Sequence, residues 1–222
     1  FLSNLNEVLE DISTKELNLE LNFLNNFNEE KERIENLKFS LNSHISNVKY
    51  NIFGTITGRL TTEKNSFPIL TLDKKFRNII KSTNDWLIEF DFNSAELRAF
   101  LGLNEKSQPE KDIHEWHKEL NNKVFSEDIS REEMKKKFFA WFYGGKEDNF
   151  GIKEIDEAYD RNKILNRYYH NNSVTTPYGR TIETDRRKAV NIVVQSTMAD
   201  IFYERVIAVS KYLREENLET YI

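Results

Sequence analysis

Four side chains that suit a nucleotide recur at four-residue intervals: Arg131, Lys135, Phe139 and Tyr143. In an α-helix each four-residue step drifts by only about 40°, so the four would form one slanting stripe. A guanidinium and an ammonium bind phosphate oxygens, and a ring and a phenol can lie beside a sugar and a base. The spacing predicts a site for a nucleoside triphosphate. The alternative is an ordinary surface helix with its basic residues in solvent and its other aromatic residues buried.

Two carboxylates, Asp91 and Glu96, follow a segment that alternates apolar and polar residues over 86–92. This alternation predicts a strand, and Asn93 would open the helix that comes next. A carboxylate at the end of a strand can hold a hard divalent ion beside a phosphate. The alternative is local, with Asp91 capping a turn and Glu96 completing a capping box begun by Asn93.

A second polar stripe, Arg187, Asn191 and Gln195, lies within an apolar run near the C-terminal end of the sequence. Guanidinium and amide donors held on one helix face can read the acceptors that every base pair shows in the minor groove. A solvent-facing stripe is the alternative. His114 and His117 are a weaker candidate, for a metal site, because no further metal ligand lies at a characteristic spacing in the sequence.

Apolar residues at three- and four-residue steps predict the helices that position these groups. They are a long amphipathic helix from Ser13 to Leu41 with at most one break, helices over 112–120 and 130–144, short helical pieces over 146–172, and a helix over 186–216 whose apolar side carries Ala189, Val193, Phe202, Val206 and Val209. A turn is predicted over 176–180. With the strand over 86–92, the fold class is α+β.

Composition narrows the classes of protein further. The 222 residues contain no cysteine, which excludes disulfides, cysteine zinc ligands and a cysteine nucleophile. The net charge of -5 argues against a protein that holds nucleic acid by overall charge. The longest apolar run, Phe138–Tyr143, is far below the roughly 20 residues of a membrane helix. We expect a soluble protein that is not secreted.

The order of these motifs resembles that of the family A DNA polymerases, the DNA polymerase I type. The resemblance covers about residues 48 to 210, and its matches lie in the family's order. They are Thr57–Thr62, similar to Thr-Gly-Arg-Leu-Ser-Ser; Asp91–Arg98, similar to motif A; Asp112–His114, the Asp-Ile-His element; the Arg131 to Gly144 stripe, which matches motif B; the Gly179-Arg180 turn; and Arg187, Asn191 and Gln195.

The resemblance implies a right-hand polymerase fold, with a palm sheet, helical fingers and part of a helical thumb. It assigns 1–50 to a thumb-like helical segment, 51–105 to the palm and 106–185 to shortened fingers. Residues 186–222 would form a helix returning to the palm, and the chain stops before motif C. The implied location is the cytoplasm of a bacterium or a phage-infected cell, or an organelle, and the Asn- and Lys-rich composition fits an AT-rich genome such as that of a phage.

The implied reaction is template-directed transfer of a nucleotidyl group from a deoxynucleoside triphosphate to a primer 3′-hydroxyl, with two Mg²⁺ ions that Mn²⁺ can replace. Asp91 and the Phe92 carbonyl would bind metal. His114, Arg131 and Lys135 would hold the triphosphate, with Lys135 screening or protonating the leaving group.

The remaining roles concern the sugar, the base pair and DNA. Phe139 and Tyr143 would border the nascent base pair, and Glu96 would block a ribose 2′-hydroxyl. The residues implied to contact primer-template DNA are Arg59, Arg187, Asn191 and Gln195.

The sequence departs from the family pattern at several points. The family's Asn-Leu-Gln-Asn-Ile-Pro segment is not recognisable around Ser66 to Leu70, and Lys111 stands where Gly usually precedes Asp-Ile-His. Motif C, the His-Asp-Glu hairpin with the second catalytic Asp, is absent from the 222 residues. We therefore expect activity to need a downstream segment or a partner chain. The alternatives are a single-subunit RNA polymerase, against which Glu96 speaks, and a catalytically incomplete polymerase-like subunit that binds DNA.

Overall fold

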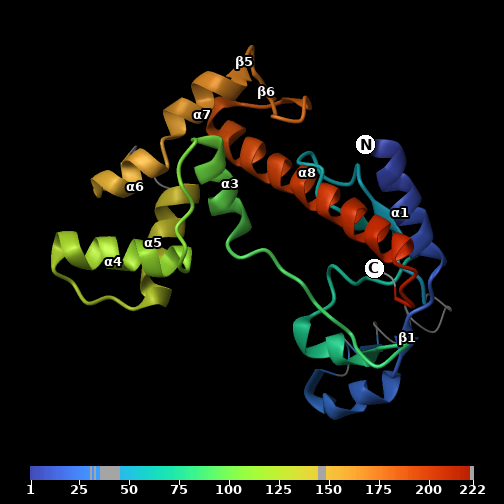
Figure 1. Cartoon of the computed structure of the whole chain (residues 1–222). Helices are drawn as coiled ribbons and strands as arrows, with labels where there is room; N and C mark the ends of the chain where they lie inside the picture. The colour runs from blue at the N-terminus through green and yellow to red at the C-terminus, as the bar shows by residue number, and fades with distance from the viewer. Residues whose placement is uncertain (31, 33, 36–45, 145–148, 221–222) are drawn as a thin grey trace. The chain divides into compact units, whose positions relative to one another are not determined.

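The structure is a computed structural model that describes residues 1–30, 32, 34–35, 46–144 and 149–220. It confirms the α+β class, because helices and three small antiparallel sheets make up its regular structure (Figure 1). The chain divides into two compact units. Unit 1 is Phe1–Phe90 with Ala199–Ile222, and unit 2 is Asp91–Met198.

Unit 1 is built from short elements around small apolar clusters. Phe67, Phe76 and Ile79 are at the centre of one cluster, and the other contains Leu5 and Leu9 with Ala199 and Tyr203. Strand β1 pairs with β4 and β2 pairs with β3, both antiparallel. The elements are α1 (Leu2–Thr14), β1 (Asn18–Leu19), η1 (Leu21–Asn26), η2 (Asn28–Glu30), β2 (Tyr50–Asn51), β3 (Thr61–Thr62), η3 (Lys74–Ile79) and β4 (Ile80–Lys81).

The prediction of a helix beginning at Ser13 is wrong. Ser13 lies in the last turn of α1, where its hydroxyl donates to the Glu10 carbonyl, and β1 and two 3₁₀ helices follow. The Leu spacing there is helical, but asparagines interrupt it, and their side chains compete for backbone hydrogen bonds and favour turns. Residues 31, 33 and 36–41 of the predicted helix lie outside the described residues.

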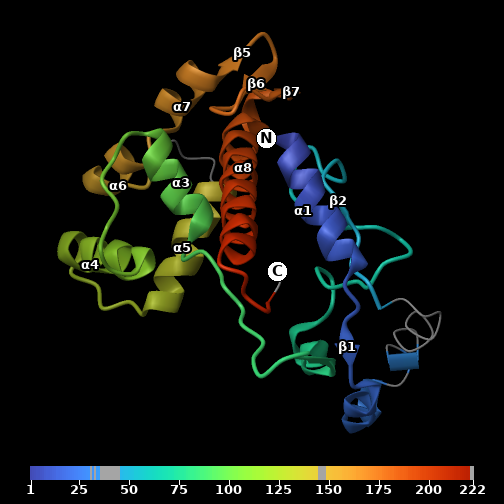
Figure 2. The same ribbon diagram turned by 45° about the vertical axis from the view of Figure 1, so that its right-hand side comes forward.

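The prediction of a strand over 86–92 is also wrong for this structure. The segment is extended, and none of its residues pairs with a described strand. Figure 2 shows it as the long trace that leads into α3. Trp86 is 83% exposed and Phe90 is 90% exposed. Alternation marks residues that suit a sheet, but a strand forms only where a neighbour supplies the backbone hydrogen bonds.

Unit 2 packs its helices around one aromatic core. Phe100, Phe138 and Tyr159 are fully buried there, and the first half of α8 contributes Ala189 and Val193. Strands β5, β6 and β7 form a three-stranded antiparallel sheet. The elements are α3 (Ala95–Leu103), α4 (Ile113–Phe125), α5 (Arg131–Gly144), α6 (Lys153–Ala158), α7 (Arg161–Tyr168), β5 (Tyr169–His170), β6 (Ser173–Thr175), β7 (Thr181–Glu183) and α8 (Arg186–Glu215).

Local signals explain where several helices of unit 2 begin. The Ser130–Glu133 capping box precedes α5, since the Glu133 carboxylate accepts from the Ser130 amide at 2.8 Å and the Glu133 amide donates back to the Ser130 hydroxyl. Asp112 caps α4 and Asp160 caps α7. The predicted turn at 176–180 is confirmed, and Gly179 takes the left-handed conformation with φ of 80°.

The predicted bounds of α8 are confirmed, but its predicted apolar side is confirmed only in the first half of the helix. Ala189 and Val193 are buried as expected, whereas Phe202 is 40% exposed and Val209 is 48% exposed. In unit 1, Ala199 and Tyr203 provide the buried side of the helix. The apolar face of α8 therefore lies on different residues in its two halves.

Replacing Phe138 by alanine should lower the free energy of unfolding by about 3–5 kcal/mol, because the ring is fully buried and leaves a cavity. Chemical denaturation followed by circular dichroism measures this change. Phe125→Ala, at a 44% exposed ring on α4, is the control and should cost about 0.5 kcal/mol. Equal losses in the two variants would contradict the core described here.

Candidate functional site

The α5 stripe borders the buried side of the helix. Met134, Phe138 and Phe142 of α5 are buried, while Arg131, Lys135 and Phe139 are partly exposed and Tyr143 is 41% exposed. The four predicted residues therefore follow one partly accessible line along the edge of the core. The burial of the adjacent side prevents α5 from turning about its axis without exposing aromatic surface.

The aromatic end of the stripe is ordered by ring contacts. Phe139 and Tyr143 stack with centroids 5.5 Å apart and planes at 21°, and the His114 ring lies 5.3 Å from Phe139. The Tyr143 hydroxyl donates a hydrogen bond to the Glu96 carboxylate of α3. The structure thus brings Glu96 together with Phe139 and Tyr143, which the sequence placed in a different motif.

At the cationic end, one cation is ion-paired and the other has no ion pair among the described residues. Arg131 binds the Asp112 carboxylate through two bonds, 3.0 Å from Nε and 2.8 Å from NH2. The Arg131 guanidinium holds the pKa of Asp112 down to about 2. The Lys135 ammonium has no ion pair with any residue that the structure describes. Lys135 is therefore available to an anion from outside.

His114 and His117 lie on α4, behind the stripe. His117 is fully buried, stacks on Phe138 with centroids 4.0 Å apart, and shares a 3.0 Å hydrogen bond with the Tyr159 hydroxyl. Burial lowers the pKa of His117 to about 3 and also lowers the pKa of His114. His114 is only 3% exposed, so the structure does not present this predicted phosphate ligand to solvent.

The predicted metal ligands lie just before α3. Asp91 is exposed and makes no hydrogen bond or ion pair with a described residue, and Phe92 is 41% exposed. Helix α3 begins after Ser94, whose conformation is left-handed and whose side chain makes no cap bond. Asn93 therefore does not open the helix as predicted, and its carbonyl instead accepts from Arg98 Nε at 3.1 Å.

These residues fit part of a magnesium site. Asp91 and the Phe92 carbonyl offer two hard oxygen donors, and Mg²⁺ often takes one or two carboxylates with phosphates and waters. No group of three or more His, Asp or Glu side chains with metal-binding geometry occurs within the described part of the chain. Glu96 already accepts from Tyr143, so it is a poor second ligand.

The predicted DNA-binding residues lie in both units. In unit 2, Arg187 is 93% exposed beside Asp185, while Asn191 and Gln195 are half-buried on the same face of α8 and make no side-chain hydrogen bond to a described residue. In unit 1, Arg59 is exposed and follows Gly58, which has a φ of 74°. The Gly58 carbonyl accepts from the Tyr203 hydroxyl, which anchors this turn.

Three residues that order the site were missed from the sequence. Arg98 of α3 donates to the carbonyls of Asn93, Pro109 and Lys111, so it ties the start of α3 to the segment before α4. Arg161 of α7 donates to the carbonyls of Trp141 and Phe142 at the end of α5. Asn104 donates to Ala158 and Asp160.

Only Arg98 carried a signal that sequence reasoning could have used, because it stands next to Glu96 and Leu97 in the motif A match. Arg161 and Asn104 belong to no motif, and their partners are backbone carbonyls 19 to 56 residues away in sequence. Such contacts leave no spacing pattern.

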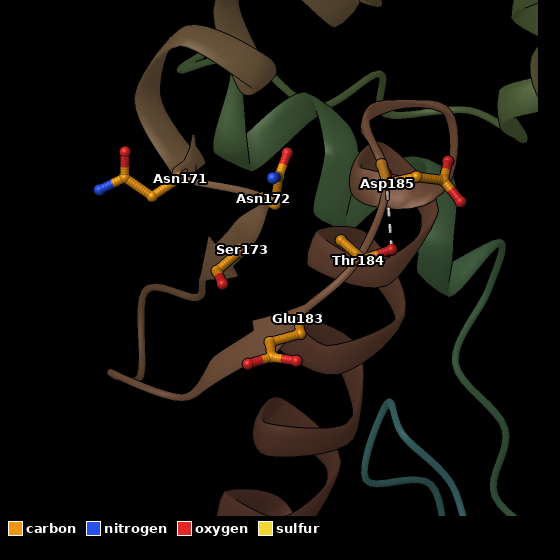
Figure 3. A pocket seen from close by; sticks show the side chains of 6 residues that line it. All are labelled: Asn171, Asn172, Ser173, Glu183, Thr184 and Asp185. Atoms are coloured by element: carbon orange, nitrogen blue, oxygen red, sulfur yellow. Dashed lines mark hydrogen bonds between the residues drawn. The ribbon is translucent and has the colours of Figure 1, made fainter.

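A polar pocket lies away from the stripe, between the β5–β6 turn and the β7–α8 junction (Figure 3). None of the predicted site residues lines it. Its lining consists of Asn171, Asn172, Ser173, Glu183, Thr184 and Asp185. Asp185 caps α8, because its side chain accepts hydrogen bonds from the backbone amides of Arg187 and Lys188 in the first turn of the helix.

The fold and site define an α+β protein with a helix that exposes cationic and aromatic residues on one face. No protein-family model and no curated protein sequence matches the chain. Among the described residues, no helix has the length and apolarity to cross a membrane.

Acid should destabilise unit 2 through His117. Its pKa is about 3 in the folded chain against 6.5 for the free side chain, so the unfolded chain binds a proton first. The contribution of neutral His117 to the free energy of unfolding is complete above about pH 6.5. It is lost as the pH falls toward 3, by up to about 1.4 kcal/mol per pH unit. His114 acts in the same direction.

Denaturation curves between pH 7 and pH 4 measure this slope in the wild-type chain and in His117→Gln. The slope should flatten in His117→Gln. The control is His170→Gln, at an exposed residue of β5, which should keep the wild-type slope. A wild-type slope in His117→Gln would show that another group controls the acid response.

Proposed function

We propose that the chain is the palm and fingers portion of a right-hand DNA polymerase of the family A type, and that it transfers a nucleotidyl group from a deoxynucleoside triphosphate to a primer 3′-hydroxyl. One observation carries the proposal: the accessible face of α5 presents cations first and stacked aromatic rings after them, with Glu96 bonded to the last ring. A triphosphate with its sugar and base has the same order of chemical groups.

Lys135 would make the first contact with the phosphates, because its charge is not committed to any described carboxylate. Charge-assisted hydrogen bonds to phosphate are roughly twice as strong as neutral ones. Phe139 and Tyr143 would stack against the sugar and the incoming base pair. Mg²⁺ bound by Asp91 and the Phe92 carbonyl would lower the pKa of the attacking hydroxyl and neutralise charge on the leaving pyrophosphate.

Sugar selection would come from Glu96. The hydrogen bond from Tyr143 fixes the Glu96 carboxylate beside the aromatic end of the stripe. A carboxylate held at that position would leave no room for a ribose 2′-hydroxyl. This placement favours a DNA polymerase over a single-subunit RNA polymerase.

Primer-template contact would use α8 and the Gly58 turn. The amide groups of Asn191 and Gln195 lie on one helix face and make no hydrogen bond with a described residue, and such donors suit the acceptors of the minor groove. Arg187 and Arg59 would add contacts to phosphate or base edges.

A second candidate function is a catalytically incomplete polymerase-like subunit that binds primer-template DNA. The observation that favours it is that Asp91 belongs to no group of three or more His, Asp or Glu side chains that could hold a metal ion among the described residues. The two candidates differ in chemistry, because the incomplete subunit would not extend a primer even with Mg²⁺ present.

Lys135→Ala should weaken binding of dATP to the 222-residue chain by about 10- to 100-fold, the loss expected for one charge-assisted contact to phosphate. Isothermal titration calorimetry measures the dissociation constant. Lys136→Ala is the matched control, because Lys136 is exposed on a neighbouring face of α5, and it should bind dATP like the wild type.

The same variants should bind primer-template DNA with nearly wild-type affinity in a filter-binding assay. A loss of DNA affinity as large as the loss of dATP affinity would make α5 a DNA-binding element. Equal dATP binding by Lys135→Ala and Lys136→Ala would remove the stripe from the nucleotide site.

Glu96→Ala should bring the dissociation constants of ATP and dATP closer together, because it removes the carboxylate that obstructs the 2′-hydroxyl. Competition between the two nucleotides for the same chain measures the ratio. Glu154→Ala, a change of the same charge at an exposed residue of α6, is the control. An unchanged ratio in Glu96→Ala would leave the sugar to another residue.

A further inference from the structure

The first cation of the stripe, Arg131, is already engaged by carboxylates. Asp112 takes two of its N–H groups, from Nε at 3.0 Å and from NH2 at 2.8 Å, and Glu132 takes a third from NH1 at 2.7 Å. Two parallel bonds between a guanidinium and a carboxylate are the strongest arrangement that this pair can form. An incoming phosphate would therefore find most of the Arg131 fork occupied.

Asp112 is itself fixed from the other side. Its Oδ1 accepts from the backbone amides of His114 and Glu115, both at 3.0 Å, and so caps α4. A carboxylate that caps a helix cannot follow Arg131 if the guanidinium moves away. The pairing can therefore be exchanged only by movement of the Arg131 side chain, which is 38% exposed.

The charges around Arg131 oppose an anion as long as this pairing persists. Asp112 and Glu132 place two negative charges against one guanidinium, whereas Lys135, one helical turn away, has no acidic partner among the described residues. A phosphate group would be attracted to Lys135 and repelled at Arg131. The two cations of the stripe are consequently unequal in the free chain.

We propose that Asp112 competes with the nucleotide's phosphates for Arg131 and thereby sets the affinity of the α5 site. Lys135 makes the first contact, and Arg131 joins only after its guanidinium has turned from Asp112 to the phosphate. Asp112 is a positioning residue, since it acts through Arg131 and not on the ligand. The inference rests on the proposed function, because it takes the α5 stripe as the triphosphate site.

The test is Asp112→Asn with dATP as the probe in metal-free buffer. Asparagine is as good a helix cap as aspartate, so α4 keeps its N-terminal hydrogen bond acceptor while the charge is lost. The dissociation constant for dATP should fall by about 1.5- to 5-fold, the range expected for one partly exposed ion pair. Thermal stability should fall at the same time, because the ion pair between Arg131 and Asp112 is lost. A purely structural defect would not combine lower stability with tighter binding.

Three further variants make the result specific. Asp112→Ser keeps a capping hydroxyl and should also tighten dATP binding. Glu154→Gln removes one charge from an exposed residue of α6 that has no ion pair with a described residue, and it should leave dATP binding unchanged. In the Arg131→Ala background, Asp112→Asn should give no gain, because the side chain over which the two anions compete is absent.

Unchanged or weaker dATP binding in both Asp112 variants would overturn the inference. If Lys135→Ala still loses dATP affinity in that case, the proposed function stands and only the competition is wrong. A tightening of equal size in the Arg131→Ala background would also overturn it, because the effect would then be general electrostatics. If the wild-type chain and all variants fail to bind dATP, the inference and the proposed function fall together.

Discussion

The accessible face of α5 depends on the burial of its other face. Phe138 lies among Phe142, Trp141, Tyr159 and the His117 ring, with contacts to residues of α4, the α6–α7 connection and α5 itself. Turning the helix would bring these rings into water, at a cost of about 25 cal/mol for each Å² exposed. This cost fixes the direction in which Arg131, Lys135, Phe139 and Tyr143 point. The polar face is therefore held by an apolar interaction.

The ends of α5 are fixed by polar contacts of a different kind. At its first turn the Ser130–Glu133 capping box ties the helix to the residue that precedes it. The Arg131–Asp112 pair ties the same turn to the residue that caps α4. At its last turn Arg161 supplies donors to carbonyls that the helix itself leaves unpaired, and its guanidinium lies 4.9 Å from the centre of the Trp141 ring. A helix held at both ends and along one side can keep two cations in place although like charges repel.

Much of unit 2 could be predicted from the sequence, because its signals are local. The helices predicted from residues 112 and 130 and the turn predicted over 176–180 occur where the structure has them, because the Asp112 cap, the Ser130 capping box and Gly179 each act within a few residues. The segment over 86–92 and the stretch after Ser13 were wrong for a common reason. Their patterns describe residues that suit a strand or a helix, but whether the element forms depends on neighbours elsewhere in the chain or on competing asparagine side chains. Within the candidate site, spacing predicted which residues share a face. It could not predict that Asp112 takes Arg131 or that Arg161 holds the end of α5, because those contacts join separate helices.

The position of Trp141 gives the molecule a built-in optical signal. Trp141 is 7% exposed in the last turns of α5, next to the Arg161 guanidinium, whereas Trp86 is 83% exposed. Indole emission shifts to the red in water and responds to nearby charge, so Trp141 and Trp86 emit at different wavelengths and can be separated. The third indole, Trp116 of α4, is half-buried against the same core, so in a Trp116→Phe chain the blue component belongs to Trp141 alone. A displacement of the end of α5 would then change the blue component while leaving the red component constant. Such a chain, without an attached dye, can thus report in real time on the helix that carries the candidate site.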